Sequence, residues 1–299
     1  MNKVEFFKNK KSQYKESRRK TLKILENGRS ADFIIPNFAR GCELGCSYCY
    51  VNRNNGLTNP LTLYTNRNEI WNAILKHYNQ LPSKVANQCD PLRWTYDIGE
   101  ATDCLSPRVV DTTKWFIDKF LADTGAKPTF ATKLSVGPKV LNPVLNKRAR
   151  IRISLMPEKI SKIVEVGTSN INARIDSILP LMSLGYEVHL NFSPVIVHEE
   201  WEKEYRLLMQ SIVKKIGGIQ MFAEVIFLTH HYGLHESNLS WIPEAEELTW
   251  KPDVQEKKTN QRGSSDIVRY EFFYKKALAN QFENMLKQEM PNCKIRYMF

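Results

Sequence analysis

The sequence predicts an α/β protein built as a partial barrel of six strand–helix units. Strand-like and helix-like segments alternate from residue 31 to residue 228, and no sequence repeat is visible. Repeated units of this kind imply a parallel sheet wrapped by helices. The 299 residues are 42% apolar, which is enough for one large core. We expect three parts: a basic arm over 1–30, the barrel over 31–228, and a C-terminal extension over 229–299.

The order of the elements follows from their hydrophobic patterns. Short apolar runs predict strands, and longer periodic runs predict helices. Strands are expected at 31–36, 94–98, 129–133, 150–155, 187–195 and 218–227, and helices near 66–78, 107–122, 171–184 and 201–214. The polar stretch 229–265, with three histidines and two prolines, is predicted to be a long loop or lid. An amphipathic helix near 270–289 and a last strand at 293–298 complete the chain.

The charge of the chain indicates its class of partner. A formal charge of +11 and a pI near 9.3 attract polyanions, so nucleic acid is the first partner to test. The basic run from Lys8 to Lys20 is either an arm that follows phosphates or the solvated face of a frayed helix. No apolar run approaches the roughly 20 residues of a membrane span, and no signal peptide is visible. We expect a cytoplasmic protein without a membrane partner.

Three of the six cysteines crowd into one short loop. Cys42, Cys46 and Cys49 have the spacing C-x3-C-x2-C, directly after the first predicted strand. Cytosolic thiols stay reduced, which argues against disulfides. Three thiolates at this spacing can hold one face of a 4Fe–4S cluster and leave one iron open for a ligand. We therefore expect a cluster site at the carboxyl end of a strand.

Two other uses of these cysteines remain open from the sequence. One is a structural zinc site completed by a distant histidine or cysteine, and the other is an ordinary electron-transfer cluster. A zinc site usually pairs two ligand knuckles, and no second knuckle with suitable spacing is visible in the sequence. His230 and His231 lie in a polar segment, and we assign no metal to them.

The cysteine loop in a six-unit chain resembles the radical S-adenosylmethionine superfamily, whose fold is a partial (β/α)6 TIM-like barrel. Within it, the chain resembles the spore photoproduct lyase family over nearly everything after Phe33. Residues 46–50 resemble its C-x-Y-C-Y motif, 130–133 its F-V-T-K strand, 150–154 its R-F-R-F-S strand, 167–169 its G-T-S turn, 194–205 its P-I-Y-x-H-E-x-W stretch, and 291–299 its P-N-A-K-I-E-Y-F ending.

This resemblance implies an activity. A 4Fe–4S cluster and S-adenosylmethionine would together generate a 5′-deoxyadenosyl radical that repairs the spore photoproduct, a thymine-dimer lesion of DNA, by carbon–carbon cleavage. Damaged DNA would be the partner, and reduced flavodoxin or ferredoxin the electron donor. Two alternatives remain: a radical enzyme with another nucleic-acid or nucleotide substrate, and a non-enzymatic iron–sulfur or zinc protein that binds nucleic acid.

The resemblance also implies roles for individual residues. Four residues fall where the family contacts S-adenosylmethionine: Tyr48, Ser106, Lys133 and Ser154. Four more fall near its lesion pocket: Tyr50, Arg269, Tyr270 and Tyr297. Lysine suits a carboxylate, while arginine and tyrosine suit phosphate and base stacking. For Tyr270 and Tyr297, an ordinary place in the core is the competing interpretation.

The hydrogen donor of the reaction is where the chain departs from the family. The family has a cysteine in E-A-x-C, whereas here Glu100 is followed by Ala101, Thr102, Asp103 and then Cys104. With a one-residue gap, Cys104 is the donor. Without the gap Asp103 takes that position, and a carboxylate cannot return a hydrogen atom. We predict Cys104 as donor, with a simple buried thiol as the alternative.

Overall fold

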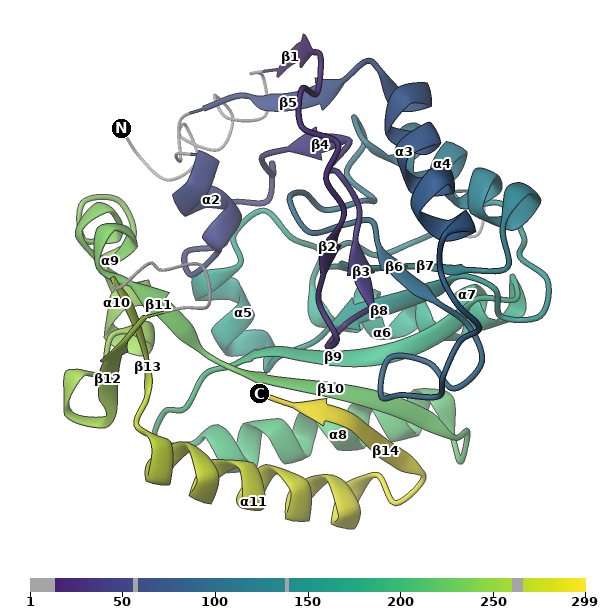
Figure 1. Ribbon diagram of the computed structural model, residues 1–299. Helices are drawn as coiled ribbons and strands as arrows, with labels where there is room; N and C mark the ends of the chain where they lie inside the picture. Colours follow the sequence, from purple (N-terminus) through teal and green to yellow (C-terminus); the bar gives the residue numbers. More distant parts are fainter. Residues whose placement is uncertain (1–13, 56–58, 138–139, 260–265) are drawn as a thin grey trace.

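The computed structural model describes residues 14–55, 59–137, 140–259 and 266–299. Most of the chain curls into an open half-barrel with helices outside it, and smaller sheets lie at its margins (Figure 1). The α/β fold class predicted from the sequence is therefore confirmed. No helix within the described ranges has the length and apolar content to cross a membrane.

The main sheet has eight strands in the order β14-β10-β9-β8-β7-β6-β3-β2. All neighbouring pairs are parallel except β2 with β3. The six predicted strands are confirmed as consecutive neighbours, so their carboxyl ends share one edge of the sheet. The bounds are β2 Leu25–Glu26, β3 Phe33–Ile34, β6 Thr95–Asp97, β7 Lys127–Thr132, β8 Arg150–Ser154, β9 Glu187–Val195, β10 Met221–Phe227 and β14 Cys293–Met298.

Helices follow the strands and bury one apolar face each against the sheet. They are α3 Arg67–Asn79, α4 Val110–Asp123, α5 Glu158–Val164, α6 Ile171–Asp176, α7 Ile178–Ser183, α8 Trp201–Ile216 and α11 Phe272–Glu289. The single helix predicted over 171–184 is divided at Ser177 into α6 and α7. Pro180 has no N–H to donate to the preceding turn, which interrupts the helical hydrogen bonds there.

A second sheet lies beside the cysteine loop, with the strand order β1-β5-β4. Its strands are β1 Tyr14–Ser17, β5 Leu61–Tyr64 and β4 Ala39–Arg40. β1 belongs to the predicted basic arm and pairs in parallel with β5, so the described part of the arm is extended rather than helical. Lys8, Lys10 and Lys11 of that arm lie outside the described residues.

The segment predicted as a long loop has regular structure, so that prediction is wrong. It contains β11 Thr229–His231, α9 Tyr232–Leu239, α10 Pro243–Thr249, the 3-10 turn Pro252–Val254 and β12 Gln255–Lys258. Together with β13 Ile267–Tyr270, the two strands form an antiparallel sheet in the order β11-β13-β12. Much of its interior is polar, including buried His230 and Glu246. Because side chains of this kind lack a hydrophobic period, the sequence pattern did not reveal these elements. We call this unit, residues 229–259 and 266–270, the C-terminal cap.

Candidate active site

The cysteine loop occupies residues 41–49, between β4 and the short helix α2 Tyr50–Asn55. It starts beyond the carboxyl end of β3, at the edge where the strands of the half-barrel end (Figure 1). Gly41 and Gly45 have φ angles of 98° and 64°, a conformation that suits glycine and lets the loop turn tightly. The predicted position of the three cysteines, after a strand, is thus confirmed.

Backbone contacts from two βα loops fix this loop. The Ser47 N–H donates to Val164 O at 2.9 Å, and the Gly41 N–H donates to Ala101 O at 3.0 Å. The Gly167 N–H donates to Leu44 O at 2.9 Å. A β-carbon on Gly167 would lie only 2.5 Å from that oxygen, so no other residue fits without displacing the backbone. The G-T-S turn at 167–169 therefore has a physical function, which is to support the cysteine loop.

The cysteine sulfurs form a donor set that suits a cationic cluster. Burial raises the pKa of the Cys42 thiol to about 12, and the charges of Asp103 and Cys49 act in the same direction. Burial, followed by the charge of Glu165, also raises the pKa of Cys46. These thiolates need a bound cation for stability, and the irons of a cluster supply one. The Ser47 hydroxyl beside them is buried and lacks a hydrogen-bond partner among the described residues.

The three cysteines supply the ligand type of an iron–sulfur cluster, which is the thiolate. Over residues 14–55, 59–137, 140–259 and 266–299, no three His, Cys, Asp or Glu side chains gather as ligands of one ion. In a cubane each cysteine binds a different iron, so its ligands are spread around the cluster. The donor set therefore fits a cluster held by Cys42, Cys46 and Cys49.

Two predicted cofactor residues meet at a carboxylate that the sequence analysis did not single out. Tyr48 donates its hydroxyl hydrogen bond to Glu165, and Lys133 Nζ lies 3.5 Å from the same carboxylate. Lys133 also donates to Ser193 O at 3.2 Å. Burial alone would raise the pKa of Glu165, but Arg174 and Lys133, with the Tyr48 hydroxyl, outweigh it and lower that pKa. Glu165 thus stays ionised and fixes both side chains beside the cysteine loop.

Ser154 belongs to the same network. Its hydroxyl accepts from Asn191 Nδ2 at 3.1 Å, across the β8–β9 pair, and its carbonyl accepts from Arg174 at 3.0 Å. Arg174 is completely buried and also binds Glu165 at 2.7 Å. The Asn191 Oδ1 atom is buried without a partner in the part of the chain that the structure describes. An unsatisfied acceptor at the carboxyl ends of strands is suited to a ligand that carries N–H groups.

Ser106 is connected to this network through Asp103. Its hydroxyl donates to Asp103 O at 3.0 Å, which stabilises the turn before α4. The Asp103 carboxylate accepts from the Lys133 N–H at 2.8 Å and from Thr132 Oγ1 at 2.9 Å. The structure therefore brings together all four predicted cofactor residues, through Glu165 and Asp103.

Cys104 is buried in the core, and its neighbour Asp103 acts electrostatically on Cys42 of the cysteine loop. The Cys104 side chain is completely buried in the hydrophobic core, with Sγ 3.6 Å from Ile98 O. A β-carbon on Gly99 would lie 3.0 Å from this sulfur. Burial raises the pKa of the thiol well above its ordinary value. In this conformation Cys104 contacts core atoms, and its role as donor stays a prediction.

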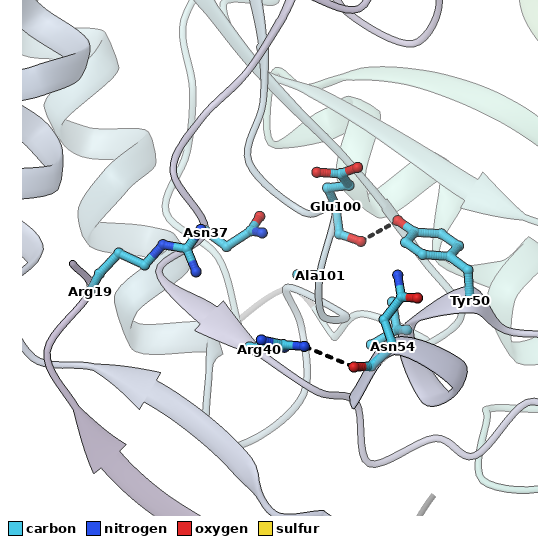
Figure 2. A pocket seen from close by; sticks show the side chains of 8 residues that line it. Arg19, Asn37, Arg40, Tyr50, Asn54, Glu100 and Ala101 are labelled. Carbon is cyan, nitrogen blue, oxygen red and sulfur yellow. Dashed lines mark hydrogen bonds between the residues drawn. The ribbon is translucent and has the colours of Figure 1, made fainter. Parts of the chain in front are cut away.

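Tyr50 lines an open pocket of about 210 Å³ next to the cysteine loop (Figure 2). Its ring is 46% exposed, and its hydroxyl donates to the carbonyl of Glu100. The remaining lining residues are mostly polar and come from the second sheet, α2 and the loop after β6: Arg19, Asn37, Arg40, Val51, Asn54 and Ala101. Tyr50 is thus the accessible member of the predicted lesion set.

The other three residues of that set are not gathered in this pocket. Tyr270 is buried in the core, where its hydroxyl accepts from the Val197 N–H at 2.9 Å. This contact agrees with the competing structural interpretation. Arg269 lies on β13 and faces Glu256 at 3.6 Å. Tyr297 lies on β14 and donates to Glu224 at 2.9 Å.

Two of the three histidines of the C-terminal cap, His230 and His235, are structural partners of one carboxylate. His230 is 2% exposed and lies 2.9 Å from Glu246, so it is buried although its segment is polar. His235 lies 2.7 Å from the same carboxylate and stacks on Trp250 at 4.0 Å. The Asn238 amide joins this cluster and also donates to Ser47 O at 2.9 Å. No sequence pattern singles out Asn238, because it is a lone asparagine in a polar segment.

A three-cysteine loop at the carboxyl edge of a parallel half-barrel, with polar groups at the adjacent strand ends, defines the radical S-adenosylmethionine class. The chain belongs to the spore photoproduct lyase family, whose model matches residues 1–299.

Individual relatives agree with this assignment. The spore photoproduct lyase of Bacillus subtilis (strain 168) is 27% identical over 212 residues, which are 71% of this chain and 59% of that protein. The enzyme of a Geobacillus species is 24% identical over 226 residues, 75% of this chain and 64% of that protein. The matched region is therefore less than two thirds of the length of these relatives.

Solved structures of spore photoproduct lyase share the fold. One is a double mutant with bound AdoMet and dinucleoside spore photoproduct. It has a TM-score of 0.87 at 21% identity, and the match covers 100% of this chain and 86% of the solved chain. Another, complexed with dinucleoside spore photoproduct, has a TM-score of 0.86 at 22% identity and covers 98% of this chain and 84% of its own. These likenesses establish the half-barrel fold.

Proposed function

We propose that this chain is a radical S-adenosylmethionine lyase that repairs the spore photoproduct in DNA. The observation that carries the proposal is the cysteine loop of Cys42, Cys46 and Cys49, placed beside a polar network that reaches Lys133 and Ser154. Membership of the spore photoproduct lyase family supports the choice of lesion. The basic charge of +11 supports DNA as the partner.

The cofactor site follows from the network around Glu165. The three cysteines hold a 4Fe–4S cluster, and Tyr48, Ser106, Lys133 and Ser154 surround S-adenosylmethionine. When bound, the reduced cluster supplies one electron that cleaves S-adenosylmethionine to a 5′-deoxyadenosyl radical. Lys133 is suited to bind the methionyl carboxylate, since Glu165 already holds its ammonium group beside Tyr48. Reduced flavodoxin or ferredoxin is the proposed electron donor.

The lesion side of the site uses the exposed aromatic ring. A base inside a duplex cannot reach a cluster at the barrel edge, so the lesion is turned out at a cost of a few kcal/mol. Stacking on Tyr50 offsets about 1–3 kcal/mol per base. Arg269, Tyr270 and Tyr297 do not line the Tyr50 pocket, and their proposed contribution to lesion binding rests on the family resemblance. Tyr270, being in the core, acts through its packing. Cys104 returns the hydrogen atom, which requires movement of the loop over 99–106 to expose its thiol.

The experiment is anaerobic reconstitution followed by chromatography for 5′-deoxyadenosine and thymidine products. An oligonucleotide that carries the spore photoproduct is compared with an undamaged one, and Cys46→Ala serves as the cluster-free control. Restored thymines, absent with Cys46→Ala, support the lyase. Reduced wild-type protein that cleaves S-adenosylmethionine but leaves the lesion intact contradicts the choice of substrate. A lack of deoxyadenosine under every reduced condition favours the non-enzymatic alternative.

A second candidate function is radical chemistry on another nucleic-acid substrate. Asp103 favours it, because the carboxylate lies at the site while the Cys104 thiol lies in the core. Without a hydrogen donor at that position, the family reaction could not be completed in the same way. Deoxyadenosine formation that depends on added RNA supports this candidate, and RNA that has no effect on the rate argues against it.

A further inference from the structure

Two arginines reach the pocket beside Tyr50 from opposite sides of the second sheet. Arg19 follows β1, and Arg40 lies on β4, while β5 separates these two strands. Figure 2 shows the Arg19 side chain reaching toward Asn37 and the Arg40 side chain reaching toward Asn54, and both residues line the pocket. The small sheet therefore acts as a platform that places two guanidinium groups at one pocket.

The Arg19 backbone is held in a fixed position. Its N–H donates to Asn66 Oδ1 at 2.8 Å, and Asn66 Nδ2 donates back to Arg19 O at 3.1 Å. Its guanidinium donates to Thr21 O at 3.1 Å and to the Tyr64 hydroxyl at 3.4 Å, and lies over the Tyr64 ring at 5.3 Å. An arginine held in this way loses less conformational entropy when it binds an anion.

Arg40 is positioned by the cysteine loop itself. It is the last residue of β4, next to Gly41, and pairs with Thr62 on β5. One terminal nitrogen donates to Asn54 O at 2.8 Å, at the end of α2 (Figure 2). Its guanidinium has further N–H donors that face the pocket.

Among the described residues that line this pocket, cationic side chains outnumber anionic ones. Over the described part of the chain, neither Arg19 nor Arg40 pairs with a carboxylate. One carboxylate-bearing residue, Glu100, lines the pocket, and its backbone carbonyl accepts from Tyr50. Arg18, the neighbour of Arg19, differs because Glu69 neutralises it at 2.8 Å. The pocket thus carries two cations against one anion.

We propose that Arg19 and Arg40 bind a backbone phosphodiester of the nucleic-acid substrate, adjacent to the nucleotide that stacks on Tyr50. Planar guanidinium groups bind phosphate oxygens through paired N–H donors, and phosphate contacts fix the position of the strand. The identity of the lesion rests on the proposed function above. The phosphodiester contact does not, because any strand that enters this pocket carries the same group.

The first test measures binding of an undamaged single-stranded oligonucleotide by fluorescence anisotropy at several salt concentrations. The Arg19→Gln, Arg40→Gln double variant is expected to bind about ten-fold more weakly, since hydrogen bonds to charged groups are lost. The slope of log K against log salt should fall by about 0.7 for each phosphate contact removed. Arg18→Gln is the matched control and should keep the wild-type slope, because its charge is already paired.

A second measurement separates a strand phosphodiester from a free anion. The ratio of repair rates for a phosphodiester-linked lesion and its phosphate-free dinucleoside should be large in the wild type and close to one in the double variant. Inorganic phosphate at millimolar concentration should leave oligonucleotide binding unchanged; strong competition by phosphate would indicate a free-anion site and overturn the proposal.

The remaining outcomes are also informative. A folded double variant with the wild-type salt slope overturns the proposal, as does an equal loss in Arg18→Gln. If the double variant does not fold, Arg19→Gln and Arg40→Gln are measured singly, and each should give part of the change. The wild-type protein could repair no lesion while the double variant still shows a smaller slope of log K against log salt. That result would contradict the proposed function and support the phosphodiester contact.

Discussion

The Asn238 side-chain amide donates a hydrogen bond of 2.9 Å to the backbone carbonyl of Ser47. These residues are 191 positions apart, and the bond connects the C-terminal cap to the cysteine loop. Asn238 is completely buried, and its amide also binds Glu246, which His230 and His235 hold in place. The cap therefore supports the cluster site directly.

Asn238→Ala should loosen this support. The change leaves the buried Ser47 carbonyl and the Glu246 carboxylate short of a donor, which costs about 1–3 kcal/mol. We expect a lower free energy of unfolding and less iron per chain after reconstitution, measured by urea unfolding and by iron analysis. Asn142→Ala removes an exposed asparagine that binds Asp118 and is the control. Wild-type stability and iron content in Asn238→Ala would contradict a supporting role.

Gly167→Ala should displace the cysteine loop. The new β-carbon would lie 2.5 Å from Leu44 O, and strain of this kind costs about 1–3 kcal/mol. We expect reduced thermal stability and a changed absorption spectrum of the reconstituted cluster. Gly137→Ala adds the same methyl group where, apart from its chain neighbours, no atom of the described residues lies within 4 Å, so it should behave as the wild type. If both alanine variants behave alike, the close approach of Gly167 has no structural consequence.

Glu224→Gln should destabilise the protein in a pH-dependent manner. Burial alone would raise the pKa of Glu224, but Arg152, His189 and Arg296 outweigh it and lower that pKa well below its ordinary value of 4.5. The carboxylate therefore stabilises the fold fully above about pH 4.5, and this stabilisation is lost as the pH falls toward the lowered pKa. The variant takes the carboxylate from the buried Arg296 side chain, while Arg152 keeps Asp97 at 2.6 Å; breaking a buried ion pair costs about 3–5 kcal/mol at pH 7.

The measurement for Glu224 is urea unfolding from pH 7 to pH 3. The difference between wild type and Glu224→Gln should be constant down to about pH 5 and then become smaller. Glu236→Gln, at an exposed glutamate of the cap, should change the free energy of unfolding by less than about 0.5 kcal/mol. A difference that increases on acidification would show that the pKa of Glu224 is raised in the folded state.

Cys104→Ala tests the proposed hydrogen donor. The variant should still form 5′-deoxyadenosine but release abnormal lesion products, because the substrate radical loses its hydrogen source. Removing the buried sulfur should cost about 1 kcal/mol of stability. Cys89→Ala, a second buried cysteine whose Sγ lies 3.5 Å from Arg29 O, is the control. A wild-type product distribution from Cys104→Ala would exclude this residue from the mechanism.

Local patterns were sufficient for the barrel and for the cluster ligands. The strand predictions over 187–195 and 293–298 coincide with β9 and β14, because short apolar runs are typical of strands. The cysteine spacing predicted the loop after the first strand of the barrel. The helix over 171–184 was less accurate, since the break at Ser177 depends on Pro180 inside an otherwise helical pattern.

The C-terminal cap illustrates what local patterns lack. Its interior holds His230, Asn238 and Glu246, which are polar residues that sequence reasoning places in solvent. They are stable inside because Glu246 forms hydrogen bonds with both His230 and Asn238. Such pairing joins residues from separate elements and has no period along the chain.

The sequence by itself determined the half-barrel class, the position of the three cysteines after a strand and the family, because these depend on spacing and hydrophobic period within short stretches. Only the tertiary structure showed that Glu165 holds Tyr48 and Lys133, that Cys104 lies in the core, and that Arg19 and Arg40 share a pocket. These relationships join residues that are distant in the chain. Folding decides them, because the direction of a side chain depends on which strands become neighbours.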